Sequence, residues 1–356
     1  MVLIRQLRHR TTFDGDGDLD LFVGSRSIPQ NYGTSPRSFI YRNDGKGLFS
    51  DATPTLAPEL AKLGMITDAE WADTDGDGKK ELIVVGEWLE PTIFEYDKGQ
   101  FLKKKITGFT DKKGWWSSLT VADLNGDGAN DLILGNLGEN SYLSNAQFLP
   151  LKLWINDFDG NQYVEKILTR TVGGRDVPIS MKKDLTDGFP FLKKTALRHA
   201  EYAQKSVQDL LPKDKIKKAL VWHINYMQSV IAMNDGKGNF TLKPLPLAAQ
   251  LSSVNVAITT DLNGDKLPDL ILGGNNFCFQ PQYGRLDANF GEVLINKGNF
   301  EFESVPFPRS SLMLKGCMVR DIHPLSIGNE NWLFFAINNQ KPRVFRIGNG
   351  LRKPEM

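Results

Sequence analysis

The stretch Asp73-Thr74-Asp75-Gly76-Asp77-Gly78-Lys79-Lys80-Glu81 alternates carboxylates with glycines and leads directly into the apolar run Leu82-Ile83-Val84-Val85-Gly86. The same arrangement returns four more times, twice closely and twice with changes. When each copy is numbered from its first residue, oxygen-bearing side chains stand at positions 3 and 5, and an acidic residue stands at position 9. The other copies start at Thr12, Asp123, Asp157 and Asp261. A loop that recurs with a strand-like run after it predicts a repeated structural unit.

The spacing of these side chains predicts a binding loop for a hard cation. Carboxylates this close together repel one another unless a cation lies among them. Calcium takes roughly six to eight oxygen ligands in a flexible geometry, which side chains at positions 1, 3, 5 and 9 and the carbonyl of position 7 can supply. Glycines at positions 4 and 6 permit the left-handed backbone of a loop that wraps around an ion. Magnesium fits less well because it demands a tighter octahedron and keeps its waters.

This numbering names the predicted calcium ligands. In the three best loops they are Asp73, Asp75, Asp77, Lys79 and Glu81; Asp123, Asn125, Asp127, Ala129 and Asp131; and Asp261, Asn263, Asp265, Leu267 and Asp269. In the two weaker loops they are Asp14, Asp16, Asp18 and Asp20, and Asp157, Asp159, Asn161 and Glu165. We expect about three to five Ca²⁺ sites. Weaker occupancy is expected where Thr12 stands at position 1 and where Gln162 replaces the glycine at position 6.

Two other kinds of loop share part of this pattern: the EF-hand or dockerin loop and the plain hairpin turn. An EF-hand or dockerin loop shares the first five positions but needs a ligand at position 12 and a helix after it. Position 12 is Val84, Leu134 or Leu272, and strand-like runs follow, so the EF-hand and dockerin interpretations are disfavoured. A plain Asp-Gly hairpin turn would explain a single copy. Three good copies with an acid at position 9 favour the cation loop.

The spacing of the loops predicts an all-β fold, a β-propeller of four-stranded blades. The first two intervals between starts are 61 and 50 residues, which is typical of a blade rather than of a helical solenoid. Apolar runs that end in Asn/Asp-Gly turns lie between the loops and predict a β-hairpin in each unit. The clearest hairpins are residues 39–49, 230–240 and 293–300. We expect about five to six blades over residues 11–347.

Two segments depart from this pattern. Residues 182–218 are rich in lysine, and Ala203, Val207 and Leu210 fall on one helical face, so a helical insertion within the propeller is predicted. Residues 1–10 match no repeat and show no alternating strand before the first loop. We therefore expect an incomplete ring with an opening between its first and last blades, which leaves strand edges exposed and favours association of copies.

Composition narrows the classes of function. The chain has 356 residues and a net charge of +1, which gives no general attraction to nucleic acid or to membranes. No apolar run reaches the length of a transmembrane helix, and residues 1–10 lack the apolar core of a signal peptide. No Ser-His-Asp set, phosphate loop or cysteine nucleophile pattern stands out, so we predict no catalytic residue and expect a binding protein rather than an enzyme.

Further short stretches belong to the same ordered pattern. They are Leu63-Gly64-Met65-Ile66-Thr67-Asp68-Ala69, Val85-Gly86-Glu87-Trp88, Gly114-Trp115-Trp116-Ser117-Ser118, Gly135-Asn136-Leu137-Gly138-Glu139-Asn140 and Phe189-Pro190-Phe191-Leu192-Lys193-Lys194. With these stretches and its loops, the chain resembles the FG-GAP/VCBS repeat family. More narrowly, it resembles the β-propeller of bacterial cartilage-acidic-protein-like proteins, which are often joined to an ASPIC/UnbV domain. Against that family, the absent leader and first strand indicate an N-terminally truncated fragment.

The resemblance implies calcium-stabilised blades and an extracytoplasmic location: secreted, periplasmic or at the cell surface. It also implies an adhesion or binding role toward a protein or glycan. The alternative is a polysaccharide-active enzyme of the propeller lyase type, which needs a general base and a group that neutralises the uronate. The connection around residues 275–285 is polar and aromatic and follows a predicted inner strand. We predict Asn276, Tyr283 and Arg285 as ligand-binding residues there.

Overall fold

The computed structural model describes residues 9–144, 149–194, 198–280, 283–307 and 309–348, and antiparallel sheets dominate it. Three sheets keep their strands in chain order, and a fourth has three strands. They are β1 (His9–Thr11), β2 (Asp20–Val23), β3 (Phe39–Asn43) and β4 (Phe49–Asp51); β5 (Met65–Ala72), β6 (Glu81–Leu89), β7 (Thr92–Asp97) and β8 (Gln100–Lys104), with β9 (Gly114–Trp115) paired to β6; β18 (Val254–Thr260), β19 (Asp269–Gly274), β20 (Glu292–Asn296) and β21 (Phe302–Ser304); and β22 (Val319–Ile327), β23 (Glu330–Ile337) and β24 (Arg343–Arg346).

One further sheet is split by an insertion, which itself contains a sheet. The split sheet consists of β10 (Ser118–Ala122), β11 (Asp131–Gly135), β16 (Val230–Asn234) and β17 (Phe240–Pro244). The insertion holds β12 (Leu151–Asn156), β13 (Glu165–Val172), β14 (Arg175–Pro178) and β15 (Leu220–Ile224), in the order β14-β13-β12-β15. Its helices are α2 (Lys182–Gly188), η4 (Pro190–Lys194), α3 (His199–Ala203), α4 (Val207–Leu210) and α5 (Lys213–Lys218). Short helices elsewhere are α1 (Thr53–Leu56), η1 (Leu60–Lys62), η2 (Thr107–Phe109) and α6 (Leu247–Gln250).

The first strands of successive sheets lie beside one another, as β1, β5, β10, β18 and β22. Polar side chains join these strands. Thr67 donates its hydroxyl to the Trp116 carbonyl (2.8 Å), and Asp68 accepts the N–H of Leu119 (2.9 Å). The Ser117 hydroxyl donates to the Val254 carbonyl (2.6 Å). The sheets therefore form a connected series, and no closed sheet is present among the described residues.

Alternate residues of each strand pack against different neighbouring sheets. In β6, Leu82 and Val84 contribute to the core shared with β2 and β3, whereas Ile83 and Val85 contribute to the core shared with β10 and β11. This is why β6 is buried along its whole length and reads as a continuous apolar run. Successive sheets thus stack face to face, and each central sheet is covered on both sides.

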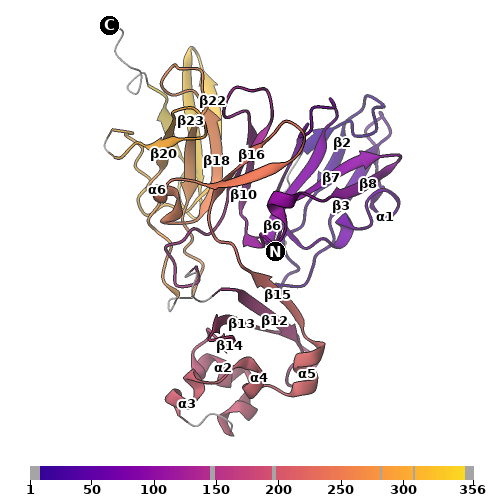
Figure 1. The fold of residues 1–356 in the computed structure, drawn as a ribbon, viewed down its shortest axis with the longest axis vertical. Helices are drawn as coiled ribbons and strands as arrows, with labels where there is room; N and C mark the ends of the chain where they lie inside the picture. Colours follow the sequence, from indigo (N-terminus) through magenta and orange to yellow (C-terminus); the bar gives the residue numbers. More distant parts are fainter. Residues whose placement is uncertain (1–8, 145–148, 195–197, 281–282, 308, 349–356) are drawn as a thin grey trace.

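The other five sheets form the body of the molecule. The chain leaves the body after β11, forms the insertion and returns at β16, and β11 and β16 pair directly. Figure 1 shows the insertion below the other sheets. It has a core of its own, centred on Phe158, Phe189 and Val207. The loop that begins at Asp157 lies in this insertion, between β12 and β13, and not in the series of stacked sheets. The long interval between the loops at Asp157 and Asp261 follows from this excursion.

The structure corrects one expectation about the start of the chain. The sequence predicted no strand before the first loop, yet β1 pairs with β2 over three residues, from His9 with Phe22 to Thr11 with Asp20. Antiparallel pairing needs only backbone N–H and C=O groups, so a short strand forms without an alternating apolar pattern. Residues 1–8 lie outside the described residues.

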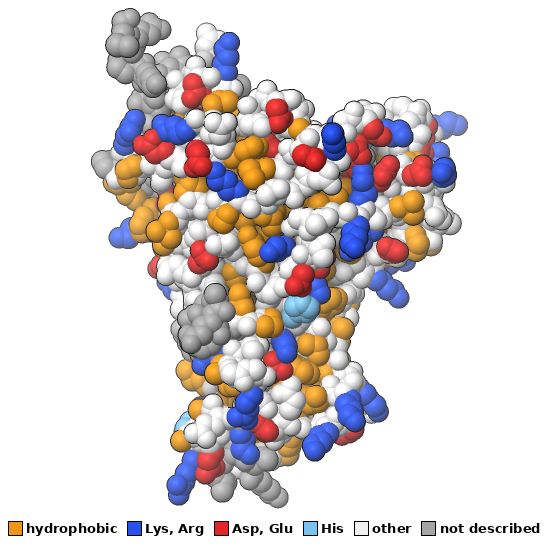
Figure 2. Space-filling model, viewed as in Figure 1, with side chains coloured by type: hydrophobic (Ala, Val, Ile, Leu, Met, Phe, Trp, Pro, Cys, Tyr) orange, Lys and Arg blue, Asp and Glu red, His pale blue; other side chains and the backbone are white. Residues whose placement is uncertain are grey.

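Two general properties of the structure bear on function. None of the described helices is long and apolar enough to cross a membrane. On the face drawn in Figure 2, basic and acidic side chains are interspersed.

Candidate metal centres

The five acidic loops each join two paired neighbouring strands; in four sheets the first of these is an edge strand, and in the insertion both are central. They join β1 to β2, β5 to β6, β10 to β11, β12 to β13, and β18 to β19. Each turns through a left-handed backbone at positions 4 and 6. In the loop at Asp73 these residues are Gly76 (φ 78°) and Gly78 (φ 83°). Non-glycine residues adopt the same conformation at position 6 of two loops, Gln162 (φ 73°) and Lys266 (φ 73°).

Position 1 organises each of the four loops that begin with aspartate. Asp73 accepts the N–H of Gly76 at one carboxylate oxygen (2.7 Å) and the N–H of Gly78 at the other (2.8 Å). Asp123, Asp157 and Asp261 accept the equivalent pairs of N–H groups. In the first loop, the Gly17 N–H donates to the Thr12 hydroxyl (3.3 Å). The backbone is therefore wrapped around position 1 even where threonine replaces aspartate.

Positions 3 and 5 continue the wrapping. In the loop at Asp261, the Asp265 N–H donates to Asn263 Oδ1 (2.9 Å), and the Leu267 N–H donates to Asp265 Oδ1 (2.9 Å). The loop at Asp123 repeats both contacts. The asparagine oxygen accepts one hydrogen bond within the loop, whereas the position 5 carboxylate also accepts the asparagine amide at its second oxygen. The backbone N–H of position 7 points inward to position 5, so only its carbonyl is free to serve a cation.

Position 9 has a second task that the sequence did not reveal. Asp131 is 1% exposed and accepts two backbone N–H groups, from Leu124 at position 2 (3.0 Å) and from Asn234 in the following hairpin (2.9 Å). Asp269 does the same with Leu262 and Asn296 (both 2.8 Å). Position 9 therefore fixes the loop to the β16–β17 or β20–β21 hairpin of its own sheet.

The hairpin asparagines connect neighbouring sheets through the loops. The Asn234 amide donates to the Thr74 carbonyl (2.8 Å) in the preceding sheet and to the Asn130 carbonyl (2.9 Å) in its own. Asn296 donates in the same way to Leu124 (2.8 Å) and Pro268 (3.1 Å). In the sequence, these asparagines directly precede the repeated Asp-Gly or Lys-Gly turns. That position is the pattern by which the sequence could have identified them. The loops at Asp73, Asp123 and Asp261 are thus part of sheet-to-sheet junctions.

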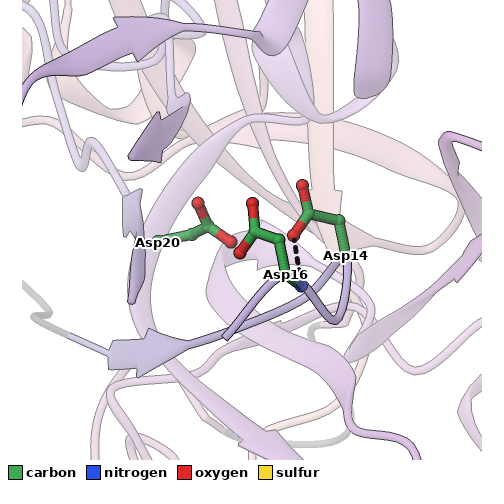
Figure 3. A group of neighbouring side chains, drawn as sticks. All are labelled: Asp14, Asp16 and Asp20. Atoms are coloured by element: carbon green, nitrogen blue, oxygen red, sulfur yellow. Dashed lines mark hydrogen bonds between the residues drawn. The ribbon is translucent and has the colours of Figure 1, made fainter. Parts of the chain in front are cut away.

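Three of the loops bring carboxylate oxygens from three residues within 4.8 Å of one another. The groups are Asp14, Asp16 and Asp20; Asp73, Asp75 and Glu81; and Asp157, Asp159 and Glu165. Figure 3 shows the first group, in which the Asp16 N–H donates to Asp14. Oxygen donors at this spacing fit a hard cation and not a soft one. These acidic groups could therefore bind a metal ion.

The carboxylates differ in pKa according to their surroundings. Burial raises the pKa of Glu81, Asp131 and Asp269 above the usual value. The Ala129 N–H lowers the pKa of Asp127 by hydrogen bonding to its charged form. The Lys104 ammonium does the same for Asp75. Asp127 and Asp75 are therefore held in the charged form, which is the form that binds cations.

The predicted ligand-binding residues lie where the insertion meets the body. The Arg285 guanidinium stacks over the Phe277 ring (4.1 Å), and Tyr283 stacks with Tyr142 (6.4 Å). Asn276 pairs through its backbone with Leu286. Tyr283 also packs in a cluster that contains core residues of both the body and the insertion. Residues 281–282 lie outside the described residues, and ligand binding here stays a prediction.

A groove of about 530 Å³ runs along the first strands of four sheets. Its polar residues come from β5, β10, β18 and β22 and include Glu70, Thr120, Thr259 and His323. Asp321 also lines it and pairs with His323 (3.0 Å). No single stretch of sequence could predict this groove, because its walls come from strands as far apart in the chain as β5 (Met65–Ala72) and β22 (Val319–Ile327).

Repeated antiparallel sheets with an acidic loop after each first strand define a class of β-repeat protein. Within it, residues 13–84 and 73–134 each match the FG-GAP-like repeat family. The chain therefore carries FG-GAP-like repeats.

Two other comparisons add little. No curated protein matches the chain. Among solved structures, it is similar to the crystal structure of the V. cholerae biofilm matrix protein Bap1, with 8% identity over 98% of this chain and 67% of that one. The TM-score of 0.30 is too low to support an argument about fold or role.

Proposed function

We propose that the chain is a calcium-stabilised β-propeller that acts as an extracytoplasmic binding or adhesion module for a protein or glycan. The observation that carries the proposal is the repetition of one wrapped carboxylate loop in five sheets, in four of them directly after the first, edge strand. A turn needed only to reverse the chain has no reason to keep an oxygen-bearing side chain at position 5 and an acid at position 9. Calcium is the hard cation whose flexible shell suits such a loop.

The propeller interpretation is supported by the stacking of sheets through their first strands. In a propeller, each blade presents its first strand to a central channel. The groove along β5, β10, β18 and β22 has this placement, with a polar lining that suits a hydroxyl-rich or charged ligand. An extracytoplasmic setting agrees with the calcium requirement, because low-affinity calcium modules work at about 10⁻⁴ to 10⁻³ M calcium.

The first test is calcium binding itself. Titration calorimetry is expected to show several calcium ions per chain, and a chelator is expected to lower the melting temperature. A site filled at a hundred times its dissociation constant contributes about 2.7 kcal/mol if the unfolded chain does not bind. Asp123→Ala should remove one ion and part of the chelator effect, whereas the exposed Asn239→Ala, in a hairpin, should remove none. An unchanged titration and melting curve would contradict calcium stabilisation.

The binding role has a separate test. The wild type is first tested for binding to a defined panel of polysaccharides and proteins. Thr259→Arg places a long side chain in the groove, so this variant is expected to lose binding to any ligand that the wild type retains. The melting temperature serves as the control for folding. Retained binding with a filled groove would move the site elsewhere.

A further inference from the structure

Three of the five loops contain a basic side chain that comes from another element. Lys104, at the end of β8, places its ammonium 2.6 Å from Asp75 Oδ2. Arg42, on β3, lies 2.8 Å from Asp14 and 3.5 Å from Asp16. Lys215, on α5, donates to the Asp157 carbonyl (2.8 Å) and lies 3.7 Å from its carboxylate. Each of these cations touches an oxygen of a residue predicted to bind calcium.

The other two loops contain no such cation. Among the described residues, no ion pair joins a lysine or arginine to the carboxylates of the loops at Asp123 and Asp261. The charged groups that act on Asp131 are Asp127 and Asp123, and those that act on Asp269 are Asp265 and Asp261, so they are acidic in both cases. These two loops need an external cation to offset that repulsion.

Whether a loop contains a basic side chain correlates with the residue at position 3. Position 3 is aspartate in the three loops with a basic side chain, as Asp14, Asp75 and Asp159. It is asparagine in the two loops without one, as Asn125 and Asn263. Asn125 and Asn263 instead donate their amides to the neighbouring position 5 carboxylate, at 2.7 Å and 2.8 Å. Aspartate at position 3 thus occurs together with a basic residue from outside the loop, which contacts position 3 itself in two loops and position 1 in the third.

We infer that Lys104, Arg42 and Lys215 are tethered counter-cations that compete with calcium, so that the chain has two classes of calcium site. The inference rests on the proposed calcium binding and concerns how it is regulated. The loops at Asp123 and Asp261 fill first. The loops at Thr12, Asp73 and Asp157 stay folded without calcium and fill only when calcium displaces the basic side chain.

Lys104 has a place to go when it is displaced. Its ammonium lies 3.5 Å from Glu95 as well as 2.6 Å from Asp75, and its side chain is 22% exposed. A small rotation therefore exchanges one carboxylate for the other and frees Asp75 Oδ2 for the metal ion. The exchange leaves no unpaired buried charge.

The test compares Lys104→Met with Lys103→Met. Lys103 is the exposed neighbour in β8, and its side chain points to the opposite face of the strand. Calcium titration by calorimetry and melting curves in chelator and in excess calcium are recorded for both variants. Lys104→Met is expected to tighten one site by about tenfold, within the range typical of coupled sites. Its melting temperature should fall below wild type in chelator and rise above it in calcium.

The opposite signs separate competition from a structural role, because loss of a purely structural ion pair lowers the melting temperature in both conditions. Asp73→Ala in the Lys104→Met background should remove the tightened site and assign it to this loop. Calcium binding with no change between Lys104→Met and Lys103→Met would overturn the inference and leave calcium binding intact. No calcium binding by the wild type would instead overturn the proposed function.

Discussion

At the scale of single residues, the acidic positions of a loop serve different purposes. In the loop at Asp123, position 5 is Asp127, which is exposed and bonds only within the loop. Position 9 is Asp131, which is buried and bonds to backbone in two elements. Both are expected to bind calcium, yet only position 9 is needed to hold the loop against its hairpin.

This difference gives a prediction for paired variants. Asp131→Ala should lower the free energy of unfolding by about 2–4 kcal/mol even in chelator, because it leaves two buried N–H groups without an acceptor. Asp127→Ala should leave the stability in chelator close to wild type and reduce only the gain from calcium. Urea unfolding in chelator and in calcium measures both effects. Equal losses in chelator would show that position 9 has no separate structural task.

At the scale of elements, the β16–β17 hairpin connects two neighbouring sheets. Asn234 is 6% exposed and donates its amide to carbonyls in two loops, one in each sheet. It also accepts the Gly236 N–H of its own turn (3.0 Å). Strand pairing holds the hairpin in its sheet, and this asparagine adds a contact to the sheet before it.

Asn234→Ala is therefore expected to cost about 2–3 kcal/mol, since it removes three hydrogen bonds at a buried position. Asn239→Ala in the same hairpin should cost about 0.5 kcal/mol or less, because Asn239 is exposed and bonds only to Asp235. Chemical denaturation of the two variants provides the measurement. Similar costs would mean that the connection between sheets contributes nothing beyond the turn.

At the scale of the whole molecule, separate cores predict separate unfolding. The insertion is built around Phe158, Phe189 and Val207, whereas Phe94 lies in the core between the first two sheets. A cluster of core residues also joins the insertion to the body, but a unit with a core of its own can open before the rest.

Phe189→Ala should create a cavity that costs about 3–5 kcal/mol and should raise hydrogen exchange only in residues 151–224. Phe94→Ala, equally buried, should instead raise exchange in β1–β8. Hydrogen exchange followed by mass spectrometry distinguishes the two patterns. Loss of protection throughout the chain in both variants would show that body and insertion unfold as one unit.

Some features could be predicted from the sequence because they depend on short-range order. The positions of the loops, the strands after them and the Asn/Asp-Gly hairpins follow from glycine placement, turn chemistry and runs of Leu, Ile and Val. The FG-GAP-like repeats over residues 13–134 follow from the same order. A loop of nine residues brings its own ligands together, so its candidate donors are readable without the fold.

The remaining features were decided by contacts between distant residues. The Asn234 amide meets Thr74 across 160 positions, and Lys104 meets Asp75 across 29. The loop at Asp157 belongs to an insertion only because β16 pairs with β11 and leaves the intervening chain outside that sheet. Short-range order determines that each loop can offer oxygens to a cation. Only the tertiary arrangement of strands and helices within each sheet or insertion decides which loops already contain a positive charge.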